Sequence, residues 1–184
     1  MAVVVLVLFV TTAGALMYEH SIIPEPPPVP TPDILLPRYQ QKVSKISSLY
    51  KSAPTSQPSP ADTAELLEEV AHDSSFAIRV RAMAVLPFLH DREKVIDVLI
   101  ACVHDRDPTA NGSGNVPLYA ASNLAEMKAC RAIPDIANWV DYLQKDKPYG
   151  QMGPMILQGS AKHLADLKAV CTQSASRPAS SVRN

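Results

Sequence analysis

The chain has 184 residues, with 17 lysines and arginines against 18 aspartates and glutamates, which suits one modest domain with short extensions. The net charge of −1 leaves no strongly basic surface, so no nucleic-acid partner is expected. Only 5% of the residues are aromatic and 6 are glycine, against 17 prolines, which disfavours a β-barrel or a glycine-rich nucleotide-binding fold. We expect an all-α protein with proline-rich connections.

The chain begins with an apolar segment. Residues 2–18 read AVVVLVLFVTTAGALMY and carry no charged side chain, at the lower length limit for a membrane-spanning helix. Ala13-Gly14-Ala15 is a small-residue pattern of the kind that signal peptidase cleaves, but no Lys or Arg precedes the apolar core. We therefore expect residues 1–20 to be a transmembrane anchor or a signal peptide. A transmembrane anchor would make this a single-pass membrane protein with its domain on the exoplasmic or periplasmic side. A cleaved signal peptide would make the protein secreted or periplasmic.

Residues 21–61 are expected to form a proline-rich stalk with a short basic helix. PEPPPVPTP at 24–32 favours an extended polyproline conformation and reads as a stiff spacer. Apolar residues then recur at helical spacing, with only basic charges between them: Leu36, Tyr39, Val43, Ile46 and Tyr50. This helix either lies on an anionic membrane surface or packs against the following domain as a cap.

The sequence of residues 62–145 predicts repeated helical hairpins. We expect Asp62 to cap the first helix of this region. A shift of 36 residues superimposes the second hairpin's first helix on that of the first hairpin, and a shift of 37 superimposes the second helices. Small residues at two matched positions are expected to let neighbouring helices approach. The predicted repeat core comprises Val80, Arg81, Ala84, Leu99, Val103, Val116, Ala120, Leu124, Ile136 and Val140.

The repeat resembles HEAT repeats of the bacterial HEAT-like (PBS-lyase-type) kind. The residues that carry the resemblance are Asp73, Val80, Arg81, Ala84 and Leu89 in the first unit, and Asp105, Asp107, Pro108, Val116, Ala120, Ala121, Leu124 and Ala132-Ile133-Pro134 in the second. The resemblance implies a short α-solenoid that acts as a non-catalytic scaffold for protein partners. The second unit departs from the pattern at Pro117, which stands where the first has Arg81, so an Arg to Asp ladder between units is broken.

A second departure is the insertion at residues 109–115, TANGSGN. Its turn-forming residues predict a mobile loop that projects between the two units. We expect partner-binding residues in this loop and near the last repeat helix, namely Asn111, Ser113, Asn115, Trp139 and Tyr142.

Residues 146–184 are expected to form a C-terminal helix and a disordered tail. Ala161, Leu164, Leu167 and Cys171 share one face of that helix and could close the far end of the repeats. Of the three cysteines, Cys102 is expected to be a buried apolar residue. If the domain is exported one disulfide can form, but the sequence does not select the pair.

The common catalytic motifs are absent from the sequence, so no enzyme activity, cofactor or metal is expected. The dipeptide His-Asp nevertheless occurs at 72–73, 90–91 and 104–105. These pairs either cap helix ends or serve a metal-dependent enzyme, as His-Glu motifs do in the HEAT-like family of deoxyhypusine hydroxylase, although the acid here is Asp. A further alternative is a small accessory subunit of a larger membrane complex, whose neighbours cover the open ends of the repeats.

Overall fold

The computed structural model describes residues 37–175, which belong to one compact unit. This part of the chain is all-α, with seven α-helices, three short 3-10 turns and no strand. The helices are α2 (Pro37–Ser52), α3 (Pro60–His72), α4 (Phe76–Met83), α5 (Arg92–Val103), α6 (Asn115–Glu126), α7 (Ile133–Asp146) and α8 (Gly153–Ala175). The expected membrane segment at 1–20 and the stalk prolines at 24–32 lie outside the described residues.

The starts of α3 and α5 follow ordinary capping chemistry. Pro60 opens α3, and the hydroxyl of Ser59 accepts a hydrogen bond from the Asp62 amide at 3.1 Å. The expected cap at Asp62 is therefore wrong by three residues, because Ser59 takes that role and the helix begins one turn earlier. Asp91 caps α5 through the Lys94 amide at 3.2 Å.

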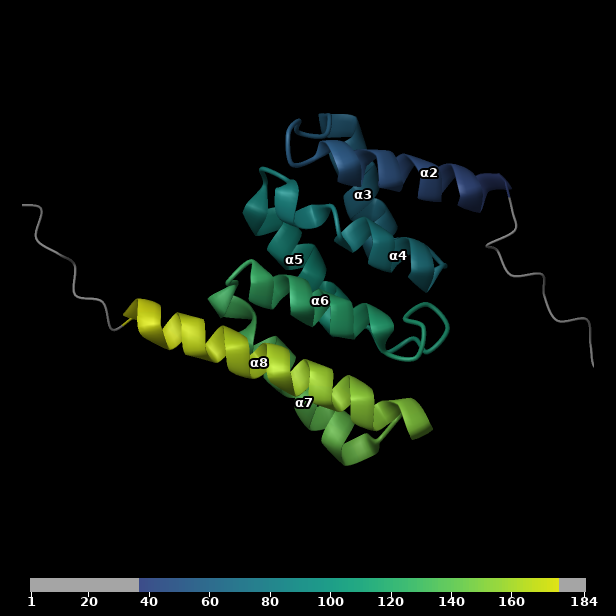
Figure 1. Ribbon diagram of the computed structural model, residues 1–184. Coiled ribbons are helices and arrows are strands. Elements are labelled where there is room, and N and C mark those ends of the chain that lie inside the picture. Colours follow the sequence, from purple (N-terminus) through teal and green to yellow (C-terminus); the bar gives the residue numbers. More distant parts are fainter. Residues whose placement is uncertain (1–36, 176–184) are drawn as a thin grey trace, which may run out of the picture. The chain divides into compact units, whose positions relative to one another are not determined.

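The helices form two layers. One layer holds α2, α4, α6 and α8, in which each helix contacts the next, and the other holds α3, α5 and α7. Consecutive helices connect the layers, with α3 packed on α4, α5 on α6 and α7 on α8. The four helices of the first layer lie in order and run in the same direction (Figure 1).

A continuous core runs between the layers. Its largest fully buried side chains include Leu66, Ile78, Leu99, Trp139 and Leu167. The basic helix, α2, packs against the rest of the domain, as the second of its two alternatives predicted. It contacts α4 and buries Tyr39 and Ile46. At the other end α8 packs on α6 and α7.

The predicted repeat core is partly wrong in the first unit. Arg81 and Ala84 are exposed and Val80 is only half-buried. The other seven predicted core residues are buried: Leu99, Val103, Val116, Ala120, Leu124, Ile136 and Val140. Instead of Val80 and Ala84, the buried face of α4 and the turn after it presents Ile78, Ala82, Met83 and Leu86.

The burial pattern aligns the first helices of the two hairpins with a shift of 38 residues rather than 36. This shift matches buried residues with buried residues, in the pairs Ile78 and Val116, Ala82 and Ala120, Met83 and Ala121, and Leu86 and Leu124. The physical reason lies at Pro87, which has no amide proton and disfavours a helical residue before it. The helix ends at Met83, and a 3-10 turn, Leu86–Phe88, follows.

Candidate interaction surface

The structure places two of the five expected partner-binding residues in the interior. Asn111 is fully buried, and its side-chain oxygen accepts a hydrogen bond from the Gly114 amide at 3.0 Å. Its amide nitrogen lies 3.4 Å from both the Asp105 carbonyl and the Tyr149 hydroxyl. These bonds fix the turn from inside, so the prediction that Asn111 meets a partner is wrong.

Trp139 is also fully buried. Its indole nitrogen donates to the Ser160 hydroxyl at 2.9 Å, which links α7 to α8. The Arg106 guanidinium lies 4.6 Å from the ring centres of both Trp139 and Tyr142. Trp139 is therefore a packing residue, and Tyr142 is half-buried beside it.

The inserted loop does not project from the surface. Asp107 accepts hydrogen bonds from the Thr109 amide at 2.8 Å and hydroxyl at 2.6 Å, and these bonds lower the pKa of its carboxyl. Gly112 has a φ of +58° and lies so close to Phe76 that an added Cβ would stand 2.3 Å from the ring. The loop thus folds against the start of α4. Of the expected loop residues Ser113 is exposed and Asn115 half-buried.

The three His-Asp pairs lie apart and each has a local partner. Asp73 accepts from the Ser75 amide at 2.7 Å, while Asp91 caps α5. His104 lies 2.6 Å from Asp135, whereas Asp105 binds the buried Arg79. Within residues 37–175 no group of three or more His, Cys, Asp and Glu side chains is arranged to hold a metal ion.

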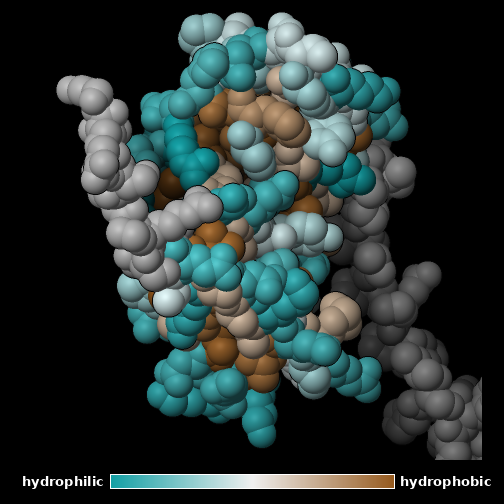
Figure 2. Space-filling model, turned by 60° about the vertical axis from the view of Figure 1, so that its left-hand side comes forward, coloured by the Kyte–Doolittle hydropathy of each residue, from teal (hydrophilic) through white to brown (hydrophobic). Residues whose placement is uncertain are grey.

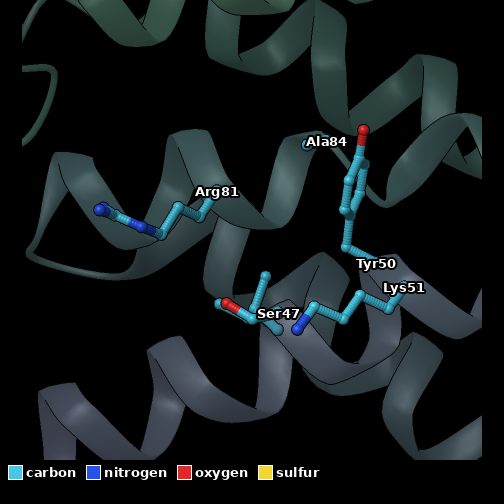
Figure 3. A pocket seen from close by; sticks show the side chains of 6 residues that line it. Ser47, Tyr50, Lys51, Arg81 and Ala84 are labelled. Carbon is cyan, nitrogen blue, oxygen red and sulfur yellow. The ribbon is translucent and has the colours of Figure 1, made fainter.

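A groove lies between α2 and α4. It has a volume of about 270 Å³ and is lined by Ile46, Ser47, Tyr50, Lys51, Arg81 and Ala84. Figure 3 shows Tyr50 of α2 pointing toward Ala84 at the C-terminal end of α4 and Lys51 extending toward Ser47, while the Arg81 side chain extends along α4 away from Tyr50. Tyr50 is 51% exposed, although its ring touches Phe88 edge-on. The two residues misassigned to the repeat core, Arg81 and Ala84, thus belong to this surface.

The cations around α2 differ in their partners. Lys45 makes ion pairs with Asp62 at 2.8 Å and Glu65 at 2.6 Å, and Lys42 pairs with Asp73 and, at 3.8 Å, with Glu69. Hydrogen bonds to these carboxylates raise the pKa of both lysines. Lys51 and Arg81 have no ion pair with any residue of the described part of the chain.

A second, smaller hollow lies near the end of the stack. It has a volume of about 190 Å³ between the end of α7 and the start of α8, and its apolar lining includes Leu143, Pro154 and Leu157. Met152 and Met155 are exposed in the same region of the sequence, at 45% and 53%. Figure 2 shows apolar surface in hollows between polar ridges on the face that it draws.

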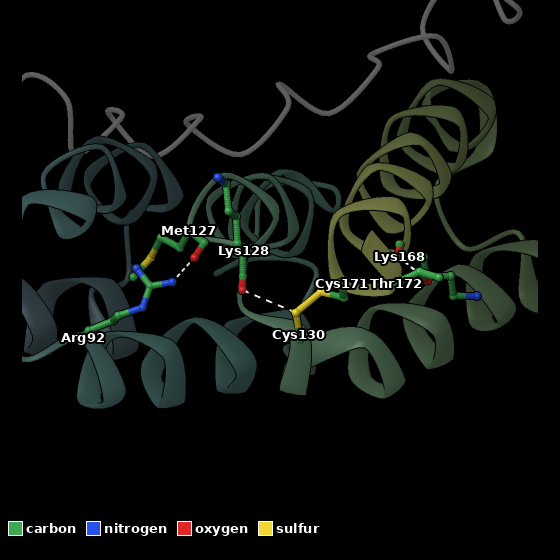
Figure 4. The surroundings of a disulfide bond; sticks show 7 residues. All are labelled: Arg92, Met127, Lys128, Cys130, Lys168, Cys171 and Thr172. Atoms are coloured by element: carbon green, nitrogen blue, oxygen red, sulfur yellow. Dashed lines mark hydrogen bonds between the residues drawn. A yellow bond between two sulfur atoms is a disulfide. The ribbon is translucent and has the colours of Figure 1, made fainter. Parts of the chain in front are cut away.

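A disulfide joins Cys130, which starts the 3-10 turn before α7, to Cys171 near the end of α8 (Figure 4). The sequence could not select this pair, because 41 residues separate the two cysteines. Cys102 is buried and free, as expected, and burial raises the pKa of its thiol. The bond fixes the last turns of α8 to the neighbouring helices.

No helix within the described residues is long and apolar enough to cross a bilayer. Comparison with known proteins found no matching protein-family model, curated protein or solved structure.

Proposed function

We propose that this protein is a non-catalytic adaptor, exported or anchored in a membrane, that binds a protein partner through a short stack of HEAT-like helical hairpins. The groove between α2 and α4 carries the proposal, because it combines an apolar floor, an exposed aromatic side chain and two cations that have no ion pair within residues 37–175. Exposed tyrosine and arginine beside an apolar hollow are typical of residues that dominate protein interfaces.

The arrangement of the helices supports the repeat part of the proposal. Parallel helices that follow one another in one layer, with their partners in a second layer, are what stacked hairpins produce. Arg79 on α4 binds Asp105 in the turn after α5, a contact between successive units of the kind that the resemblance implied for Arg81. Pro117 aligns with Arg79 under the 38-residue shift, so the next unit lacks this contact.

The disulfide supports export. Disulfides persist in oxidising compartments and are rare in the cytosol, where thiols are kept reduced. An apolar segment at residues 2–18 supplies the means of reaching such a compartment, as an anchor or as a cleaved signal. We propose that residues 37–175 act on the exoplasmic or periplasmic side, with the membrane as a partner of the N-terminal segment.

A second candidate function is an accessory subunit of a larger membrane complex. The observation that favours it is the apolar hollow at the end of the stack, with Met152 and Met155 exposed nearby. Neighbouring subunits would cover that end. Aggregation of the purified protein that is cured by co-expression with other subunits would favour this candidate over a free adaptor.

A further alternative is a metal-dependent enzyme that uses His72, His90 and His104. Metal analysis of protein purified without chelators decides it, since a stoichiometric metal would support the enzyme. Loss of that metal on substitution of Asp73, Asp91 and Asp105 would assign it to the His-Asp pairs.

Site-specific photo-crosslinking in the native host tests the adaptor proposal. A photoreactive amino acid is placed in turn at Ser47 in the groove, at Tyr119 on α6 and at Met155 on α8, all of them exposed. We expect a discrete protein adduct from at least one position, strongest at Ser47. Absence of a discrete adduct from all three positions would contradict an adaptor function.

A further inference from the structure

We infer that the groove between α2 and α4 recognises a peptide segment in which an apolar side chain is flanked by carboxylates. This inference rests on the proposed function and adds the chemistry of the partner. It follows from the shape of the groove, from the way its arginine is held and from the charge balance around α2.

The shape of the groove suits a side chain better than a whole small molecule. Its volume of about 270 Å³ lies just below the range of roughly 300–1,000 Å³ that is usual for small-molecule pockets. Ile46, only 3% exposed, and Ala84 give it an apolar floor, and Tyr50 stands beside them half-exposed. One apolar side chain of a peptide could occupy this hollow and cover the tyrosine ring.

The arginine is oriented but not neutralised. One guanidinium nitrogen of Arg81 donates to the Tyr39 hydroxyl at 3.3 Å and to the Ala77 carbonyl at 3.2 Å. Both acceptors are uncharged, and a guanidinium has five N–H donors, so further donors remain for a ligand. The planar guanidinium can donate two parallel hydrogen bonds to the two oxygens of a carboxylate, and among side-chain acceptors the carboxylate fits this geometry best.

The basic side chains of α2 and α4 differ in whether a carboxylate neutralises them. On the side of α2 that faces α3, Lys42 and Lys45 are paired with carboxylates. Around the groove, Lys51 and Arg81 have no such partner within the described residues. Arg38, at the start of α2, also has no ion pair among these residues. Lys51 and Arg81 are the two such cations that line the apolar hollow, where a carboxylate next to a seated apolar side chain would meet them.

An anionic membrane is the other occupant that cations could attract. Membrane binding by electrostatics usually needs clusters of about four to eight exposed basic residues. Lys42, Lys45 and Arg79 are paired with carboxylates. The cations of α2 and α4 without an ion pair among the described residues are therefore Arg38, Lys51 and Arg81, fewer than such a cluster needs. The structure therefore favours a peptide.

Peptide titration of the full-length protein tests the inference. The probes are two fluorescent peptides with the same leucine and phenylalanine positions, one flanked by glutamates and the other by lysines. The variants are Lys51→Glu with Arg81→Glu, Lys51→Glu alone in case the pair impairs folding, and Lys168→Glu on α8 as a matched control. Lys168 is exposed and lies on a different helix.

We expect the acidic probe to bind the native protein and the Lys168→Glu control equally, and the double variant about ten-fold more weakly, since each exposed charge pair contributes up to about a few-fold in affinity. The lysine probe should prefer the double variant. Equal binding of the acidic probe to native and double-variant protein would overturn the inference. So would binding to phosphatidylserine vesicles that depends on Lys51 and Arg81 while the acidic probe fails to bind.

The crosslinking experiment separates the two possible failures. Discrete adducts at Tyr119 or Met155, together with no binding of the acidic probe, would overturn the groove inference and leave the adaptor function standing. No adduct at any position would reject the adaptor function itself.

Discussion

The disulfide between Cys130 and Cys171 should contribute a large part of the stability of the folded chain. The bond joins residues 41 apart. Loop closure over that separation restricts the unfolded chain by about 4 kcal/mol at 25 °C in the chain-entropy treatment. Total stabilities of small domains are roughly 5–15 kcal/mol, so this is a substantial fraction. Replacing both cysteines with serine should therefore lower the urea midpoint by about 2 M, taking a slope of about 2 kcal/mol per M.

Urea titration followed by circular dichroism measures this loss, with and without a reductant. Reductant should shift the native protein to the midpoint of the double variant and leave the variant unchanged, which serves as the control. Hydrogen exchange should show the loss of protection concentrated in the last turns of α8, around Cys171. A stability loss below about 1 kcal/mol would refute the reasoning, because the unfolded chain would then gain little freedom from breaking the bond.

Three further changes test individual contacts. Arg79→Ala should lower the free energy of unfolding by about 3 kcal/mol in chemical denaturation, because it breaks a nearly buried ion pair with Asp105. Arg81→Ala, at an exposed position, should lower it by less than about 0.5 kcal/mol. Equal losses for the two variants would contradict the assigned helix register. Gly112→Ala should destabilise the protein by about 1–3 kcal/mol, because the backbone there has a positive φ and an added Cβ would meet the ring of Phe76. The same substitution in a Phe76→Ala background should cost less, because the ring is then absent. Burial lowers the pKa of His163 below its usual 6.5. Between pH 6.5 and the lower folded-state pKa, the unfolded chain therefore binds a proton that the folded chain does not. The free energy of unfolding should fall as the pH drops through this range. His163→Gln should flatten that part of the pH profile, and an unchanged slope between native and variant protein would contradict the assignment.

The sequence predicted the helical class, the second helix of the first hairpin and the second hairpin well, because apolar residues there recur on a single stripe. Leu99, Val103, Ile136 and Val140 are spaced at helical intervals and all are buried. The packing of the C-terminal helix followed for the same reason, since Leu164 and Leu167 share the face that meets α6 and α7.

The register of the first helix of the first hairpin was wrong because α4 carries two competing stripes. Val80 and Ala84 form one, and Ile78 with Ala82 forms the other, two residues earlier. Periodicity alone does not choose between stripes two residues apart. The signal that could have decided is Pro87, which ends the helix early and turns the chain.

The candidate site depended on contacts between distant segments that no local pattern contains. Arg81 lies 30 residues after Lys51 in the sequence, and their juxtaposition follows from the packing of α2 on α4. The buried roles of Asn111 and Trp139 were missed because polar loop residues and tryptophan are common in both interfaces and interiors. Their internal partners, Gly114 and Ser160, become visible only in the fold.

The central claim is that this helical stack works outside a reducing compartment. The most direct measurement is intact mass spectrometry of the protein from its native host, after alkylation of denatured material with and without prior reduction, in the membrane, exported and cytosolic fractions. In membrane or exported material we expect one alkylated cysteine before reduction, Cys102, and three after it. Three alkylated cysteines without reduction, in protein recovered from the cytosol, would contradict the central claim.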